Sequence, residues 1–133
     1  MLNQNEVKEK ILTLRSGNAL LAIIPEVGGY ITRYCLKNKE QILELMRPAT
    51  TSGLAAKNQW GMGSFPMVPF SNRIRNGRFS FQGQHIKMSP NFPPEAHTIH
   101  GHGWKAPWTV TKVEENRAMI EYRHFPDERP SMI

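Results

Sequence analysis

The chain has 133 residues, a formal net charge of +6, and 39% hydrophobic and 21% charged residues. This length fits one domain, and this balance excludes a wholly disordered chain. No apolar run approaches the ~20 residues needed to span a bilayer, and residues 1–10 lack the hydrophobic segment of a signal peptide. We expect a soluble, cytoplasmic protein with no membrane partner, and the single cysteine, Cys35, agrees with a reducing compartment.

The positive charge is scattered along the chain. No block of five or six like charges occurs, and the densest group is Arg73, Arg75 and Arg78. Nucleic-acid binding usually requires a clustered basic surface, so we expect no nucleic-acid partner. A small anionic ligand near these three arginines stays an alternative.

Strand patterns dominate the first third of the chain. Apolar and β-branched residues fill 11–15 and 19–24 on either side of a Ser16-Gly17-Asn18 turn, and they return at 30–36 and 41–46. Short successive strands joined by tight turns favour an antiparallel meander.

Residues 47–63 break this pattern. Their Thr, Ser, Gly, Ala and Asn content predicts a long loop with room for one helical turn. Alternation resumes in 78–82 and 85–88 around Gly83, and the segments 108–113 and 117–122 predict a second hairpin. Together these patterns predict an all-β fold, an antiparallel β-sandwich.

The segment 66–77 is the first candidate for function. Two prolines stiffen it and Asn76-Gly77 closes it, which suits a fixed presentation of Asn72 and Arg73. The planar guanidinium of Arg73 offers five donors, which match sugar hydroxyls or a carboxylate. The alternative is a structural turn with solvated arginines.

A histidine cluster is the second candidate. His97, His100 and His102 fall within six residues, and in an extended segment His100 and His102 share a face, as in some metal sites. A cupin-type site would add a glutamate shortly afterwards, but none occurs before Glu114, so we expect no metal. Two alternatives remain: solvated histidines at a glycine turn, or a neutral imidazole that hydrogen-bonds a ligand oxygen.

Trp104 and Trp108, on either side of Lys105-Ala106-Pro107, are the third candidate. An exposed indole face stacks against the C–H face of a sugar ring, whereas a buried indole belongs to the core. The strand pattern around Trp108 favours the core. The residues around Trp104 leave both roles open.

In their order along the chain, these segments resemble the aldose 1-epimerase (galactose mutarotase) family. The matching segments are Gly28-Gly29, Pro69-Phe70-Ser71-Asn72-Arg73-Ile74, Asn76-Gly77-Arg78-Phe79, Ile99-His100-Gly101 with Trp104, and Pro107-Trp108. The resemblance covers nearly the whole chain but only the N-terminal part of a family member, whose fold is a β-supersandwich. It implies a single, incomplete mutarotase-like β domain over residues 1–133.

The resemblance implies interconversion of the α and β anomers of an aldohexose, with no cofactor. In the family, the arginine of the Asn-Arg-Ile segment and the histidine of the His-Gly segment contact the sugar, and these are Arg73 and His100 here. Asn72 and Trp104 are weaker transfers as substrate-binding residues. Galactose, glucose and a hexose phosphate all remain open as the sugar.

The family's catalytic acid is a second histidine well after the His-Gly segment, and its base is a glutamate near the C-terminus. Neither has a match here, since His124 lies too close to His100 and the glutamates fit no family segment. We therefore expect a truncated, inactive form without a complete catalytic set. A non-catalytic carbohydrate-binding domain, a small histidine-metal β-barrel enzyme, and a homo-oligomer formed through exposed sheet edges are the alternatives.

Overall fold

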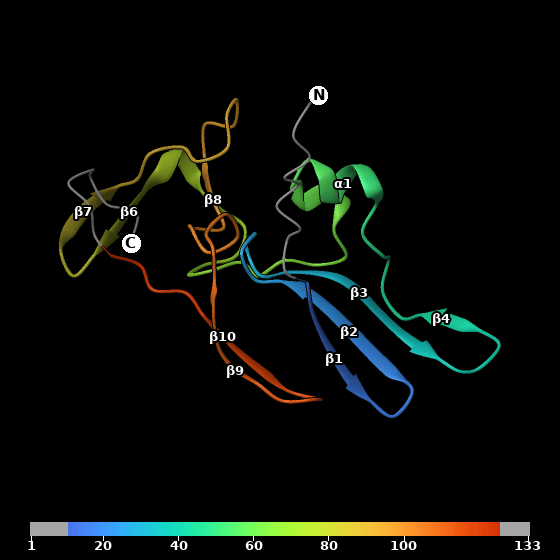
Figure 1. Cartoon of the computed structure of the whole chain (residues 1–133). Helices are drawn as coiled ribbons and strands as arrows, with labels where there is room; N and C mark the ends of the chain where they lie inside the picture. The colour runs from blue at the N-terminus through green and yellow to red at the C-terminus, as the bar shows by residue number, and fades with distance from the viewer. Residues whose placement is uncertain (1–10, 126–133) are drawn as a thin grey trace, which may run out of the picture.

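The computed structural model describes residues 11–125, and its first four strands form an antiparallel meander (Figure 1). These strands, adjacent in chain order, are β1 (Leu12–Ser16), β2 (Ala19–Ile24), β3 (Tyr30–Lys37) and β4 (Ile42–Glu44). Gly17 turns the chain from β1 into β2 with a φ of +54°, which glycine adopts because it has no Cβ. The meander predicted from the sequence is confirmed.

The other described strands pair in twos, and each pair is antiparallel. They are β5 (Arg73–Ile74) with β8 (Thr98–Ile99), β6 (Arg78–Phe81) with β7 (Gln84–Lys87), and β9 (Thr109–Val113) with β10 (Ala118–Glu121). The last two pairs are the two predicted hairpins. The sequence did not predict the β5–β8 pair, because strands of two residues are too short to show alternation.

Helical structure in residues 11–125 is confined to short turns. Helix α1 (Thr51–Ala55) and the 3₁₀ turn η1 (Gln59–Gly61) lie in the predicted long loop, and η2 (Arg75–Gly77) lies at the Asn-Gly turn. Thr50 caps α1, since its hydroxyl accepts a hydrogen bond from Gly53 N (3.0 Å). The all-β antiparallel class is confirmed, and none of the described helices is long and apolar enough to cross a membrane.

The core lies where the meander meets the loops of the second half of the chain. Its buried apolar side chains are Leu14, Ala22, Ile24, Tyr30 and Cys35 from the meander, and Met62, Met88, Ile99 and Trp104 from later segments. Gly28 makes a close approach between the two parts, because a Cβ added there would lie 2.2 Å from the carbonyl oxygen of Trp104. This contact ties the turn after β2 to the loop that carries Trp104.

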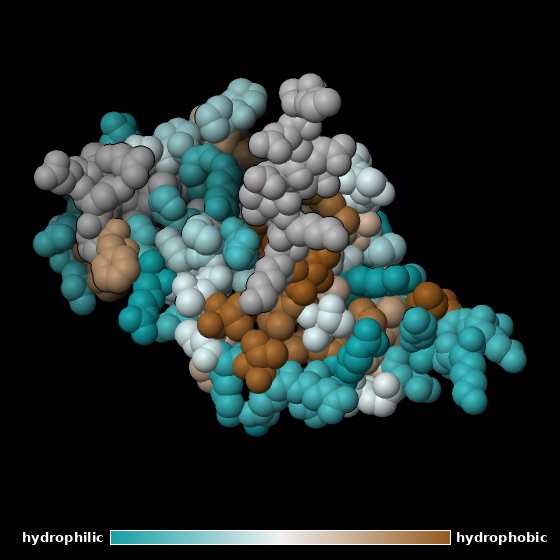
Figure 2. Space-filling view, viewed as in Figure 1, coloured by the Kyte–Doolittle hydropathy of each residue, from teal (hydrophilic) through white to brown (hydrophobic). Residues whose placement is uncertain are grey.

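Apolar side chains also remain on the surface. Figure 2 shows them gathered over the region where β1 and β9 approach each other, with a second group near β4. Among the most exposed are Leu43 (60%), Val113 (52%) and Met119 (61%). Apolar surface of this kind is typical of faces that pack against something else.

Candidate functional site

Two loops predicted to carry function meet at the β5–β8 pair. Its register places Arg73 opposite Ile99 and Ile74 opposite Thr98, and a parallel bridge joins Val68 to Gly101. The residues just outside this pair are Asn72 and His100, which lie 28 positions apart in the sequence. The fold therefore brings three of the predicted site residues, Asn72, Arg73 and His100, into one place.

Asn72 and His100 form a reciprocal hydrogen-bonded pair. The backbone N–H of Asn72 donates to Nδ1 of His100 (2.9 Å), and the backbone N–H of His100 donates to the carbonyl oxygen of Asn72 (3.0 Å). Both residues have left-handed backbones, with φ values of +63° and +57°. That conformation is uncommon outside glycine, and such strained residues cluster at ligand sites. The pair is thus a structural reason to place function here.

The hydrogen bond from Asn72 determines the state of the His100 ring. Nδ1 accepts, so in the neutral ring the proton lies on Nε2, which is left as a donor. Burial lowers the pKa of His100, and the positive charge of Arg73 lowers that pKa further. His100 is therefore a neutral imidazole near pH 7 and offers one N–H to a ligand oxygen.

Arg73 is held by a carboxylate that the sequence did not single out. Its Nε donates to Oε2 of Glu95 at 2.9 Å, and 48% of the Arg73 side chain remains exposed. Among residues 11–125, no side chain or carbonyl accepts a bond from its Nη1 or Nη2. Glu95 thus fixes the guanidinium at one nitrogen while the rest of the planar fork can meet a ligand.

Asn91 holds the backbone on both sides of His100 by hydrogen bonds. This residue was not among those predicted from the sequence. Its Nδ2 donates to the carbonyl oxygens of Ile99 (2.7 Å) and Gly101 (2.8 Å), while its Oδ1 accepts from Ile99 N (2.9 Å). These bonds hold both neighbours of His100 in place. Asn91 lies in a proline-rich loop without a recognisable motif, so no signal in one sequence distinguishes it.

The prediction that Trp104 contacts the substrate is corrected by the structure, because this side chain is buried. Its indole is only 1% exposed, and its Nε1 donates to the carbonyl oxygen of Gly101 (3.0 Å). It packs edge-on against His100 with ring centroids 5.8 Å apart. A buried indole cannot stack on a sugar, so Trp104 supports His100 from the core. Trp108 is half-buried, donates to Gly103 O (2.7 Å) and packs against Tyr122, in line with the predicted core role.

The three clustered histidines do not converge on one point. Nδ1 of His97 accepts from the backbone N–H of Asn76 (3.0 Å), His100 faces Asn72, and the His102 ring packs on His124 with centroids 5.3 Å apart. Within residues 11–125, no group of three His, Cys, Asp or Glu side chains could hold a metal ion. The histidine-metal alternative therefore lacks a ligand set in the described part of the chain.

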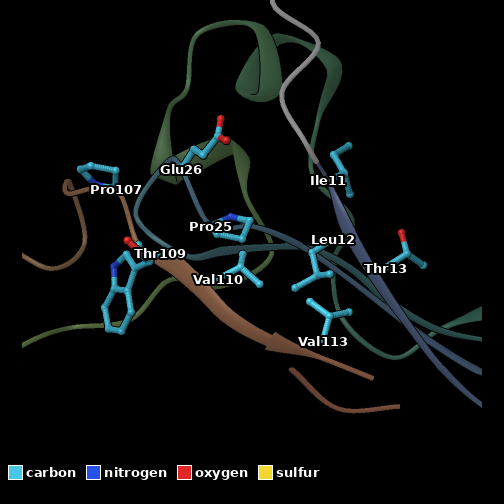
Figure 3. A pocket seen from close by; sticks show the side chains of 10 residues that line it. Ile11, Leu12, Thr13, Pro25, Glu26, Pro107, Thr109, Val110 and Val113 are labelled. Carbon is cyan, nitrogen blue, oxygen red and sulfur yellow. The ribbon is translucent and has the colours of Figure 1, made fainter. Parts of the chain in front are cut away.

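An apolar groove of about 480 Å³ lies between β1 and β9, away from these residues (Figure 3). Leu12, Pro25, Val110 and Val113 point into it, and Glu26 is the one carboxylate among the lining residues that the structure describes. None of Asn72, Arg73 and His100 lines it. With few polar groups to orient a sugar, the groove is suited to packing rather than to sugar recognition.

A family model described as aldose 1-epimerase matches residues 10–131. The chain belongs to the aldose 1-epimerase family. The Escherichia coli K12 protein YphB, itself uncharacterised, is 32% identical over 114 residues. A solved Escherichia coli K12 structure with a provisional aldose 1-epimerase name is 31% identical, with a TM-score of 0.74. A galactose mutarotase-like structure from Clostridium acetobutylicum is 25% identical, with a TM-score of 0.60.

These aldose 1-epimerase relatives are much longer than the chain. The matches cover 86%, 88% and 84% of the chain but only 36% of YphB, 37% of the Escherichia coli structure and 34% of the Clostridium structure. The family resemblance and the galactose-mutarotase-like fold predicted from the sequence are both confirmed.

Proposed function

We propose that this chain binds an aldohexose between Arg73 and His100, and that the full-length form of the protein interconverts the α and β anomers of that sugar. The observation that carries the proposal is the reciprocal pair of Asn72 and His100, held in left-handed backbone beside a half-exposed arginine. Membership of the aldose 1-epimerase family supports a sugar as the ligand of this site.

The available donors suit a sugar. Nε2–H of a neutral His100 can donate to a ring oxygen or a hydroxyl, and the outer guanidinium nitrogens of Arg73 can donate to two more oxygens. The Asn72 residue is exposed, so its side-chain amide is a candidate for a third contact. Sugar hydroxyls can satisfy all of these donors at once.

In this proposal, the residues that bind the sugar are different from the acid and base that convert it. Opening the ring requires one group to protonate the ring oxygen and another to remove the C1 hydroxyl proton. Arg73 cannot act as a base because a guanidinium does not lose its proton in proteins. Nδ1 of His100 already accepts a hydrogen bond from the backbone N–H of Asn72, so this nitrogen is not free to take a proton from the sugar. We therefore propose that the polypeptide of residues 1–133 binds without catalysing, and that the acid and base belong to parts of the relatives that it does not match.

Two measurements on the same samples test this. Saturation-transfer NMR with galactose and with glucose measures binding, and polarimetry of fresh α-anomer measures turnover. Arg73→Lys keeps the charge and removes the planar fork, so we expect at least a tenfold loss of affinity, since hydrogen bonds from charged groups contribute about 1.5–3 kcal/mol. Arg78→Lys, an exposed arginine on β6, is the matched control and should bind normally.

The outcomes separate the two halves of the proposal. No sugar binding by the parent chain, or equal affinity for the Arg73→Lys and parent chains, contradicts the site. Rapid mutarotation by the 133-residue chain would instead contradict the assignment of the acid and base to other segments. Titration with a hexose 6-phosphate in the same assay shows whether Arg73 and Arg75 favour a phosphate, because that preference should weaken as salt is added.

A further inference from the structure

Trp60 presents an exposed indole on a backbone that is held on both sides. Its N–H donates to Oδ1 of Asn58 (2.9 Å) and its carbonyl oxygen accepts from Nη2 of Arg47 (3.0 Å), yet 57% of the residue is exposed. The next residue, Gly61, packs directly on Gly53, since a Cβ added to Gly61 would lie 2.4 Å from Gly53 Cα. A rigid turn therefore carries an aromatic ring that the core does not bury.

A chain of ring contacts links Trp60 to the site. Trp60 meets Phe65 edge-on at 6.5 Å between centroids and Phe92 at 6.1 Å. Phe65 in turn lies 5.9 Å from the His100 ring, and both phenylalanines contact the buried Trp104. Trp60 is thus the outer member of the aromatic cluster whose inner members support His100.

The surface beside Trp60 is hollowed. A pocket of about 270 Å³ is lined by Trp60 and Phe65 together with the polar side chains of Arg47, Gln59 and Ser64. Unlike the groove between β1 and β9, it combines aromatic area with several hydrogen-bonding groups. That mixture suits a sugar, which has both C–H faces and hydroxyls. Arg73 and His100 are not among the described lining residues of this pocket, and the ring of Phe65 connects it to the ring of His100.

We propose that Trp60 is the aromatic platform of the sugar site, with its exposed indole stacked on the C–H face of an aldohexose held by Arg73 and His100. This inference rests on the proposed function. It gives to Trp60 the role that the sequence left open for Trp104, which is too deeply buried to perform it. The stacking contact adds affinity through dispersion rather than through further hydrogen bonds.

The test compares Trp60→Ala and Trp60→Phe with the parent chain in titrations with galactose and glucose. Stacked aromatic contacts contribute about 0.5–1.5 kcal/mol, so Trp60→Ala should bind about two- to tenfold more weakly. Trp60→Phe, which keeps a smaller ring, should fall in between. Phe81→Ala is the matched control, because Phe81 is equally exposed (58%) but lies on β6.

A second readout does not depend on a folded Trp60→Ala variant. Bound sugar should shield the Trp60 fluorescence of the parent chain from acrylamide, and this protection should disappear in Trp60→Phe, where only Trp104 and Trp108 emit. The role of Trp60 is refuted, and the Arg73–His100 site is not, if three results are found together. The parent chain binds sugar and Arg73→Lys weakens that binding, sugar leaves the acrylamide quenching of the parent chain unchanged, and both Trp60 variants bind sugar as tightly as the parent chain. Absence of sugar binding by the parent chain refutes both.

Discussion

Replacing Gly101 with alanine tests whether the two site loops are locked together. Gly101 has a φ of +68°, and a Cβ added to it would lie 2.2 Å from Pro69 Cδ and 2.5 Å from the carbonyl oxygen of Val68. The left-handed backbone costs an L-residue about 1–2 kcal/mol, and overpacking costs about 1–3 kcal/mol more. We therefore expect Gly101→Ala to lower the free energy of unfolding by about 2–5 kcal/mol.

Gly83→Ala separates these two costs. Gly83 has a φ of +75° and no atom within 4 Å of an added Cβ, so its replacement has the conformational cost alone. Both variants also lose the same unfolded-state freedom of glycine, which cancels in the comparison. Urea unfolding with a shared slope should place the midpoint of Gly101→Ala clearly below that of Gly83→Ala.

Equal midpoints for the two alanine variants would refute the reasoning. They would mean that the Val68–Pro69 backbone moves aside at no cost, and that the bridge between Val68 and Gly101 does not restrain the neighbouring His100. A lower midpoint with unchanged sugar binding would refute a narrower claim, namely that the position of His100 depends on this close approach. Sugar titration of the folded variant distinguishes these cases.

Three further predictions concern the support of the site and the exposed faces. Asn91→Asp should destabilise the fold by about 1–3 kcal/mol in urea, because a carboxylate cannot donate to the carbonyl oxygens of Ile99 and Gly101. The pKa of His100 is lowered, so as pH falls through about 6.5 the unfolded chain binds a proton first and stability should decrease until His100 itself is protonated; NMR titration should show a midpoint that rises in Arg73→Gln. We expect association through the apolar faces, and Val113→Lys should shift the mass measured by light scattering towards a monomer, whereas a monomeric parent chain would contradict this.

Local patterns were sufficient to predict most of the strands. The meander and both hairpins have alternating or apolar runs bounded by Gly, Asn or polar turns, and each appears in the structure near its predicted position. The pairing of β5 with β8 could not be predicted, because it joins two-residue segments far apart in the chain. Its geometry comes from tertiary contacts, such as the hydroxyl of buried Thr98 donating to Ser89 O (2.9 Å).

The candidate site residues also fall into two groups: those that lie in a sequence motif and those whose role depends on tertiary packing. Motif order led to the prediction of Arg73, His100 and Asn72, and the fold brings these three residues together. Motif order could not predict Asn91 or Glu95, whose roles depend on the direction of one side chain in a loop. Trp104 and Trp60 show the limit most clearly, because both are tryptophans in glycine-containing loops and only packing decides that the first is 1% and the second 57% exposed.

The hydrogen bonds around the proposed sugar site do not involve the apolar groove. The hydrogen bonds and ion pair that hold Arg73 and His100 all join residues within the segment 68–104. The groove instead lies between β1 and β9, at the two ends of the described chain (Figure 3). Contacts that fill the groove should therefore change stability or association without altering the hydrogen bonds that hold Arg73 and His100.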